Sequence, residues 1–153
     1  MQTLDAIVSE HPFFRGLKSE QLKFIAGCAS NVVFKSGEFL YREGDEANNF
    51  YIIRAGRVAI EAFSVKQRAI TIQTLTVGDV LGWSWLFPPY QAHFGVKAIE
   101  LTRAICFDGK CLRNKCEEDH DLGYELMKRF SEVMIHRLQA TRLQLLDVYG
   151  EDG

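Results

Sequence analysis

Residues 77 to 98 gather the side chains that are best suited to bind a small molecule. The segment reads VGDVLGWSWLFPPYQAHFGVKA and holds both tryptophans of the chain, Trp83 and Trp85. A histidine, His93, follows them. Aromatic side chains bury large apolar areas, so two interpretations are open. The cluster either fills the protein core or forms the wall of a binding pocket.

Length and composition limit the classes of protein to consider. The chain has 153 residues, of which 47% are hydrophobic and 25% charged, with a formal net charge of -2. These values predict one folded domain with an appended element. The slight negative charge argues against a strongly electrostatic nucleic-acid binder. We find no apolar run long enough for a membrane span and no signal segment, so we expect a cytoplasmic protein without membrane contact.

Neither a metal site nor an enzyme is predicted. Cys28, Cys106, Cys111 and Cys116 are expected to be free thiols. The last three recur every five residues, a spacing that would turn successive side chains about 140° apart on a helix. The sequence also contains no nucleophile elbow, P-loop or HExxH motif.

The chain divides into three zones. Residues 1–30 read as a helical lead-in, residues 31–108 as β-structure, and residues 109–149 as helices. In the middle zone, short apolar runs alternate with glycine-containing turns, which is typical of a sandwich or barrel. The predicted strands are 32–34, 39–42, 50–53, 58–65, 69–76, 96–99 and 104–107.

The last zone predicts a short helix capped by Asp108 and a long helix that begins near Asp119 or Asp121. Apolar residues recur along the long helix in steps of three and four, which favours a homodimer interface. The alternative is a helix packed wholly within the monomer. The predicted interface residues are Met127, Phe130, Met134, Leu138, Thr141, Leu145 and Val148.

Three segments resemble one known family. Residues 34–60, FKSGEFLYREGDEANNFYIIRAGRVAI, resemble the amino half of a cyclic-nucleotide-binding domain of the Crp–Fnr regulator type. The preceding HPFFRGLKSEQL is similar to the family's lead-in helices, and GDVLGWSWLF lies where the family has its phosphate-binding cassette. The resemblance implies an antiparallel β-roll (a jelly roll, or double-stranded β-helix) between N-terminal helices and a long C-terminal dimerisation helix.

The resemblance also implies which residues surround a ligand. In nucleotide-binding members the cassette combines a glycine and a glutamate with a later arginine, which neutralises the cyclic phosphate. Here Gly82 matches the glycine, but Trp83 takes the glutamate position and His93 the arginine position. We therefore expect cAMP and cGMP not to bind in the usual manner. The predicted pocket residues are Gly82, Trp83, Ser84, Trp85, Leu86, Phe87, His93 and Phe94.

What replaces the nucleotide stays open at this point. The favoured interpretation is that the aromatic side chains themselves plug the pocket. A pocket for an apolar or planar ligand is the alternative, and haem held by His93 is a further one. No cofactor is expected under the favoured interpretation.

The sequence thus predicts a non-enzymatic regulatory or sensor module that works as a homodimer and through a protein partner. The chain ends shortly after the long helix, so we expect no helix-turn-helix and no direct DNA binding. A non-sensing scaffold subunit and a fragment of a DNA-binding regulator are the alternatives.

Overall fold

Two antiparallel sheets form the centre of the molecule. The computed structural model describes residues 3–63, 66 and 68–150. Within this part, four strands pair in the order β1–β8–β3–β6 and four in the order β2–β7–β4–β5. The predicted antiparallel β-roll is confirmed. The strands are β1 (Ala29–Phe34), β2 (Phe39–Tyr41), β3 (Asn49–Ala55), β4 (Val58–Phe63), β5 (Ala69–Leu75), β6 (Val80–Leu81), β7 (Gly95–Ala98) and β8 (Thr102–Asp108).

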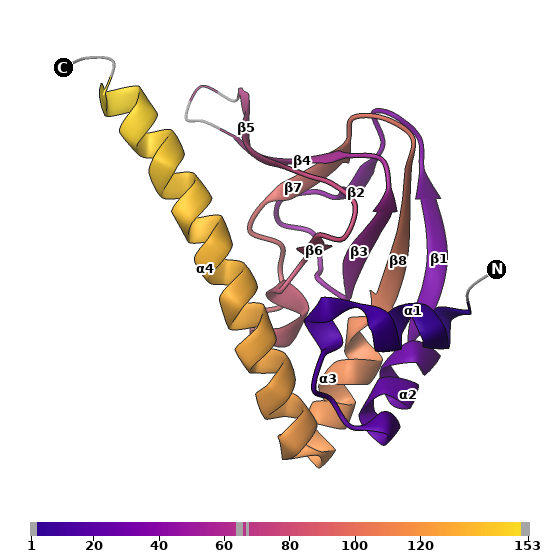
Figure 1. The fold of residues 1–153 in the computed structure, drawn as a ribbon. Helices are drawn as coiled ribbons and strands as arrows, with labels where there is room; N and C mark the ends of the chain where they lie inside the picture. Colours follow the sequence, from indigo (N-terminus) through magenta and orange to yellow (C-terminus); the bar gives the residue numbers. More distant parts are fainter. Residues whose placement is uncertain (1–2, 64–65, 67, 151–153) are drawn as a thin grey trace.

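The helices gather at one end of the sheets, except for a long one that runs along their side (Figure 1). Asp108 caps the helix that follows β8, as predicted, by accepting a hydrogen bond from Cys111 N at 3.1 Å. The helices are α1 (Leu4–Glu10), the 3-10 helix η1 (Pro12–Phe14), α2 (Ser19–Gly27), the 3-10 helix η2 (Ser84–Leu86), α3 (Gly109–Glu118) and α4 (His120–Gly150). Among the described residues, no helix is both long enough and apolar enough to cross a membrane.

Each strand predicted from the sequence overlaps a strand of the structure. The predicted strand 58–65 corresponds to β4, which ends at Phe63, and residues 64 and 65 lie outside the described residues. The very short β6 was not predicted. Two residues are too few to produce a periodic pattern, and Leu81 and Val80 are recognisable as strand only from their pairing with β3.

The hydrophobic core has two parts. One part fills the interior of the sheets and includes Leu40, Ile60 and Val96. The other lies beneath the helices and is rich in aromatic residues. In it the rings of Phe50 and Phe107 stack with their centroids 4.4 Å apart. This second core is where α4 attaches to the β-roll.

The first part of α4 packs inward rather than against a second copy. Leu122, Leu126 and Phe130 are fully buried, and Phe130 packs edge-on against Phe50 with ring centroids 5.0 Å apart. The assignment of Phe130 to a dimer interface is therefore wrong. It lies on the same side of the helix as Leu122 and Leu126, and that side faces the core because residues four apart share a face.

The turn between β3 and β4 requires glycine for two separate reasons. Gly56 has a φ of +92°, a backbone conformation that favours glycine. A Cβ at this position would also lie 2.7 Å from Thr102 Oγ1 and would overlap Leu101 O. Thr102 is fully buried, and its hydroxyl donates to Glu100 O at 2.9 Å, so it has no free space to move into. Gly37 has the same φ of +92° but open space around it.

We predict that Gly56→Ala destabilises the fold more than Gly37→Ala does. Both substitutions force alanine into the left-handed region at a cost of about 1–2 kcal/mol. Only Gly56→Ala adds the steric overlap, which costs a further ~1–3 kcal/mol. Urea unfolding of the two variants measures the difference. An equal loss in free energy of unfolding would contradict the close packing described at this turn.

Candidate functional site

A cavity of about 170 Å³ lies between the β-strands and α4. Leu40, Ile60 and Leu81 contribute an apolar surface from the strands, while Arg137 and Thr141 reach the cavity from α4. An apolar hollow with a few convergent polar groups is the usual form of a small-molecule site. Thr141, which the sequence predicts at a dimer interface, is exposed and also borders the cavity.

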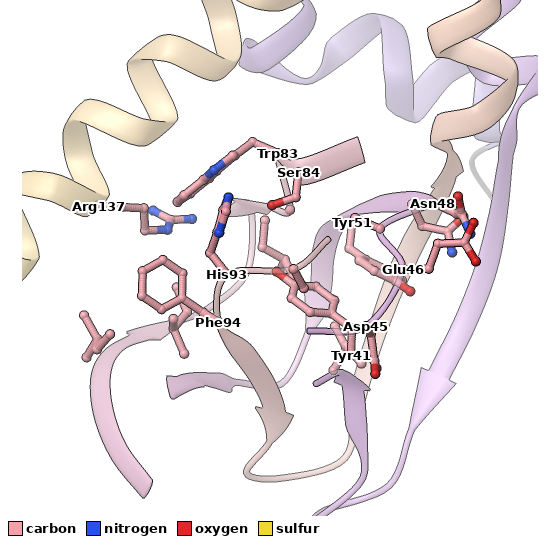
Figure 2. Close-up of a pocket in the computed structure, with 18 of the residues that line it drawn as sticks. Tyr41, Asp45, Glu46, Asn48, Tyr51, Trp83, Ser84, His93, Phe94 and Arg137 are labelled. Atoms are coloured by element: carbon pink, nitrogen blue, oxygen red, sulfur yellow. The ribbon is translucent and has the colours of Figure 1, made fainter. Parts of the chain in front are cut away.

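Five of the predicted pocket residues line this cavity, namely Gly82, Trp83, Ser84, His93 and Phe94. They come from the segment that joins β6 to β7. The rings of Trp83 and Phe94 meet edge to face, with centroids 6.3 Å apart and planes at 76°. Figure 2 shows the imidazole of His93 near these two rings. The segment therefore supplies one aromatic wall of the cavity.

The other three predicted pocket residues point elsewhere. Trp85 and Leu86 belong to the core beneath the helices, and Phe87 packs against that core. The cause is η2, because a 3-10 helix has three residues per turn and residues two apart point in widely different directions. Trp83 therefore faces the cavity, while Trp85 faces the aromatic core.

The favoured prediction places the whole aromatic cluster in the pocket, whereas the structure divides the cluster between the core and the cavity wall. Trp85 is fully buried and stacks on Phe50, with ring centroids 5.4 Å apart. Arg113 donates to Trp85 O at 2.6 Å and lies 3.9 Å above the ring of Tyr90. Neither Trp85 nor Tyr90 lines the cavity, so the part of the cluster that can fill it is Trp83 and Phe94.

Arg137 is the functional candidate that sequence reasoning missed. It is half-buried, and its Nη2 donates to Val80 O in β6 at 2.5 Å. Its Nε is buried without a hydrogen-bond partner among the described residues. Burial lowers the pKa of Arg137, although a guanidinium stays charged at neutral pH. One signal could have found it: Arg137 lies two helical turns after Phe130, on nearly the same side of α4.

The polar groups of the cavity are divided by charge. Asp45 and Glu46 lie on the side away from Arg137 (Figure 2). Two phenols, Tyr41 and Tyr51, also line the cavity. Burial raises the pKa of both, to about 12 for Tyr51, so each keeps its proton and can donate a hydrogen bond. The cavity thus offers one cation at the α4 side and acceptors at the opposite side.

The cysteines do not gather into a metal centre within the described residues. No group of three or more histidine, cysteine, aspartate or glutamate side chains there is arranged to hold a metal ion. Burial raises the pKa of Cys28 to about 12 and that of Cys116 to about 11. Both are therefore protonated at neutral pH, whereas a metal binds the thiolate.

The outer side of α4 carries an apolar stripe. Of the predicted interface residues, Met127, Leu138, Leu145 and Val148 are exposed and Met134 is half-buried. Leu138 is 69% exposed. Further exposed apolar residues, some of them off the predicted seam, extend this surface. They are Tyr124, Ile135, Leu143, Leu146 and Tyr149.

Comparison with known protein families identifies the β-roll. Residues 31–119 match the model of the cyclic nucleotide-binding domain. A CRP-like cAMP-activated global transcriptional regulator of Mycobacterium tuberculosis is 23% identical over 149 residues, which is 97% of this chain. The chain spans 65% of the length of that regulator. The regulatory subunit of the cAMP-dependent protein kinase of Schizosaccharomyces pombe is 35% identical over 104 residues, 68% of this chain and 24% of the subunit.

Solved structures agree with the family match. A candidate cyclic nucleotide-binding protein of Geobacter metallireducens is 26% identical and superposes with a TM-score of 0.78, covering 90% of this chain and 99% of its own. The match of the family model covers more than half of the chain, and it includes the segment 77–98 that forms the cavity wall. The chain therefore belongs to the cyclic nucleotide-binding domain family, in a form that resembles the Crp-like regulators.

Proposed function

We propose that this chain is a regulatory sensor that binds a small molecule between the β-roll and α4 and acts as a homodimer. The proposal rests on one observation: α4 lines the cavity with one face and exposes an apolar stripe on another. Arg137 and Thr141 line the cavity, while Leu138 and Leu145 are exposed on the apolar stripe. A ligand that contacts α4 would favour one position of the helix, and so one geometry of the dimer.

The relatives support a regulatory role. The mycobacterial relative is named a transcriptional regulator and the fission yeast relative a kinase regulatory subunit. We infer regulation rather than catalysis for this chain too. Ser84 and His93 both line the cavity, but among the described residues no side-chain hydrogen bond joins them into a nucleophile and base.

Each zone of the chain has a part in this proposal. Residues 31–108 hold the ligand, and residues 109–149 convert its presence into a change at the apolar stripe of α4. In the first zone, Val8, Phe14 and Ile25 pack in the core that α4 also joins, so this zone fixes the N-terminal half of that helix. We propose that the output is read by a protein partner that contacts the dimer.

We further propose that cAMP and cGMP are not bound in the usual manner. Trp83 and His93 stand at the positions where the family resemblance expects the glutamate and the arginine, and both face the cavity. Each missing charge-assisted hydrogen bond costs about 1.5–3 kcal/mol, so losing both weakens binding on the order of 100- to 10,000-fold.

Calorimetry with cAMP and cGMP tests this claim. We expect a Kd weaker than about 100 µM for the natural sequence. We expect micromolar affinity to appear in the double variant Trp83→Glu with His93→Arg, because it restores both charged partners. The matched control is Trp83→Gln with His93→Gln, which opens the same space without charge and should gain nothing. Micromolar binding of either nucleotide by the natural sequence would contradict the claim.

Light scattering tests the dimer. At tens of micromolar we expect a dimer for the natural sequence and a monomer for Leu138→Glu with Leu145→Glu, because charge in the apolar stripe opposes its burial. His136→Glu adds charge about 200° around the helix from Leu138 and should stay dimeric. A monomeric natural protein would overturn the dimer proposal.

A further inference from the structure

Arg137 has no ion-pair partner in the described part of the chain, so its charge is offset only in part, by the more distant carboxylate of Asp79. Its guanidinium has one hydrogen-bond acceptor, the neutral carbonyl of Val80, and it takes part in no ion pair there. The nearby carboxylate of Asp79 instead accepts from Thr76 N at 2.8 Å. A half-buried cation loses part of its hydration. A cavity that holds such a cation without an ion-pair partner can therefore bind an anionic ligand.

The guanidinium also has free donors. Arginine offers five N–H groups in a rigid fork that matches the two oxygens of a carboxylate or phosphate. Nη2 is engaged by Val80, while Nε lacks an acceptor among the described residues. An acid group that replaced water at this position would gain charge-assisted hydrogen bonds.

The surroundings of Arg137 favour a planar body next to that acid group. Figure 2 shows the guanidinium pointing from α4 toward His93, on the side of the cavity that also carries Trp83 and Phe94. Leu81 and Ile72 add apolar surface on the same cavity. A flat aromatic molecule can cover these rings and bring one acid group to the guanidinium.

We propose that the cavity binds an aromatic organic anion whose single carboxylate or phosphate pairs with Arg137 while its ring lies against Trp83 and Phe94. This inference rests on the proposed function, since it names the ligand class of the same pocket. In this proposal the positive charge that binds the anion comes from α4. In the cassette, His93 stands where the family resemblance expects an arginine.

Calorimetry with naphthaleneacetate and its uncharged amide, naphthaleneacetamide, tests the proposal. The two molecules share one ring system and differ in charge. The natural protein should bind the acid at least about tenfold more tightly than the amide, as expected for one charge-assisted contact. The preference should fall to about onefold in Arg137→Gln and be partly kept in Arg137→Lys, which retains charge without the fork.

Arg142→Gln is the matched control. It removes the same charge from the same helix at an exposed position outside the cavity, so the preference for the acid should be unchanged. Circular dichroism of each variant verifies that α4 remains folded, and the comparison of the two ligands in the natural protein needs no variant.

Two results would count against the account in different ways. Equal affinity for acid and amide in the natural protein, or an unchanged preference in folded Arg137→Gln, would overturn the anion site alone. Failure of the natural protein to bind either molecule would overturn the small-molecule pocket of the proposed function, and the anion site with it.

Discussion

The packing of Phe130 against Phe50 and Trp85 fixes the position of α4, and the rest of the site depends on it. The ring centroids of Phe130 lie 5.0 Å from those of Phe50 and 5.5 Å from those of Trp85. Truncating such a buried ring to alanine typically costs about 3–5 kcal/mol. This contact sets both the height and the rotation of α4, so Arg137, two turns further along, faces the cavity rather than solvent. Gln144 continues the attachment by donating to Ile72 O of β5 at 3.0 Å.

The segment between β6 and β7 contributes side chains both to the aromatic core and to the cavity wall. Trp85 joins the aromatic core that holds α4, and Trp83 faces the cavity that α4 covers. A single 3-10 turn separates these two roles. Gly82 precedes it with a φ of +92°, and a Cβ there would lie 3.2 Å from Asn49 O, so the segment also approaches β3 closely. The cavity wall and the anchor of the long helix are therefore mechanically linked through neighbouring residues.

The β-roll could be predicted from the sequence because its signals are local. Glycines at chain reversals and short apolar runs depend on neighbouring residues, and the strands formed where those patterns predicted them. The fate of the aromatic cluster could not be predicted in this way. Whether Trp85 fills the pocket or the core depends on the direction of a side chain after a 3-10 turn, which the family resemblance alone does not fix.

For the long helix, too, the sequence pattern did not determine which side chains face the core. Its apolar steps predicted a seam, but the rotation of the helix was decided by a tertiary contact, which took Phe130 into the core. Arg137 was not among the residues that the sequence predicted for the pocket. Its neighbours in the sequence gave no sign of burial, and only its spacing from Phe130 placed it toward the cavity.

A crystal structure of the protein, with the electron density examined between Trp83, His93 and Arg137, tests the central claim most directly. We expect an open cavity at this place, with solvent or a bound anion against the guanidinium of Arg137 and with Trp85 in the core. Density showing the side chains of Trp83 and Phe94 packed into that space, with Arg137 turned out to solvent, would contradict the account.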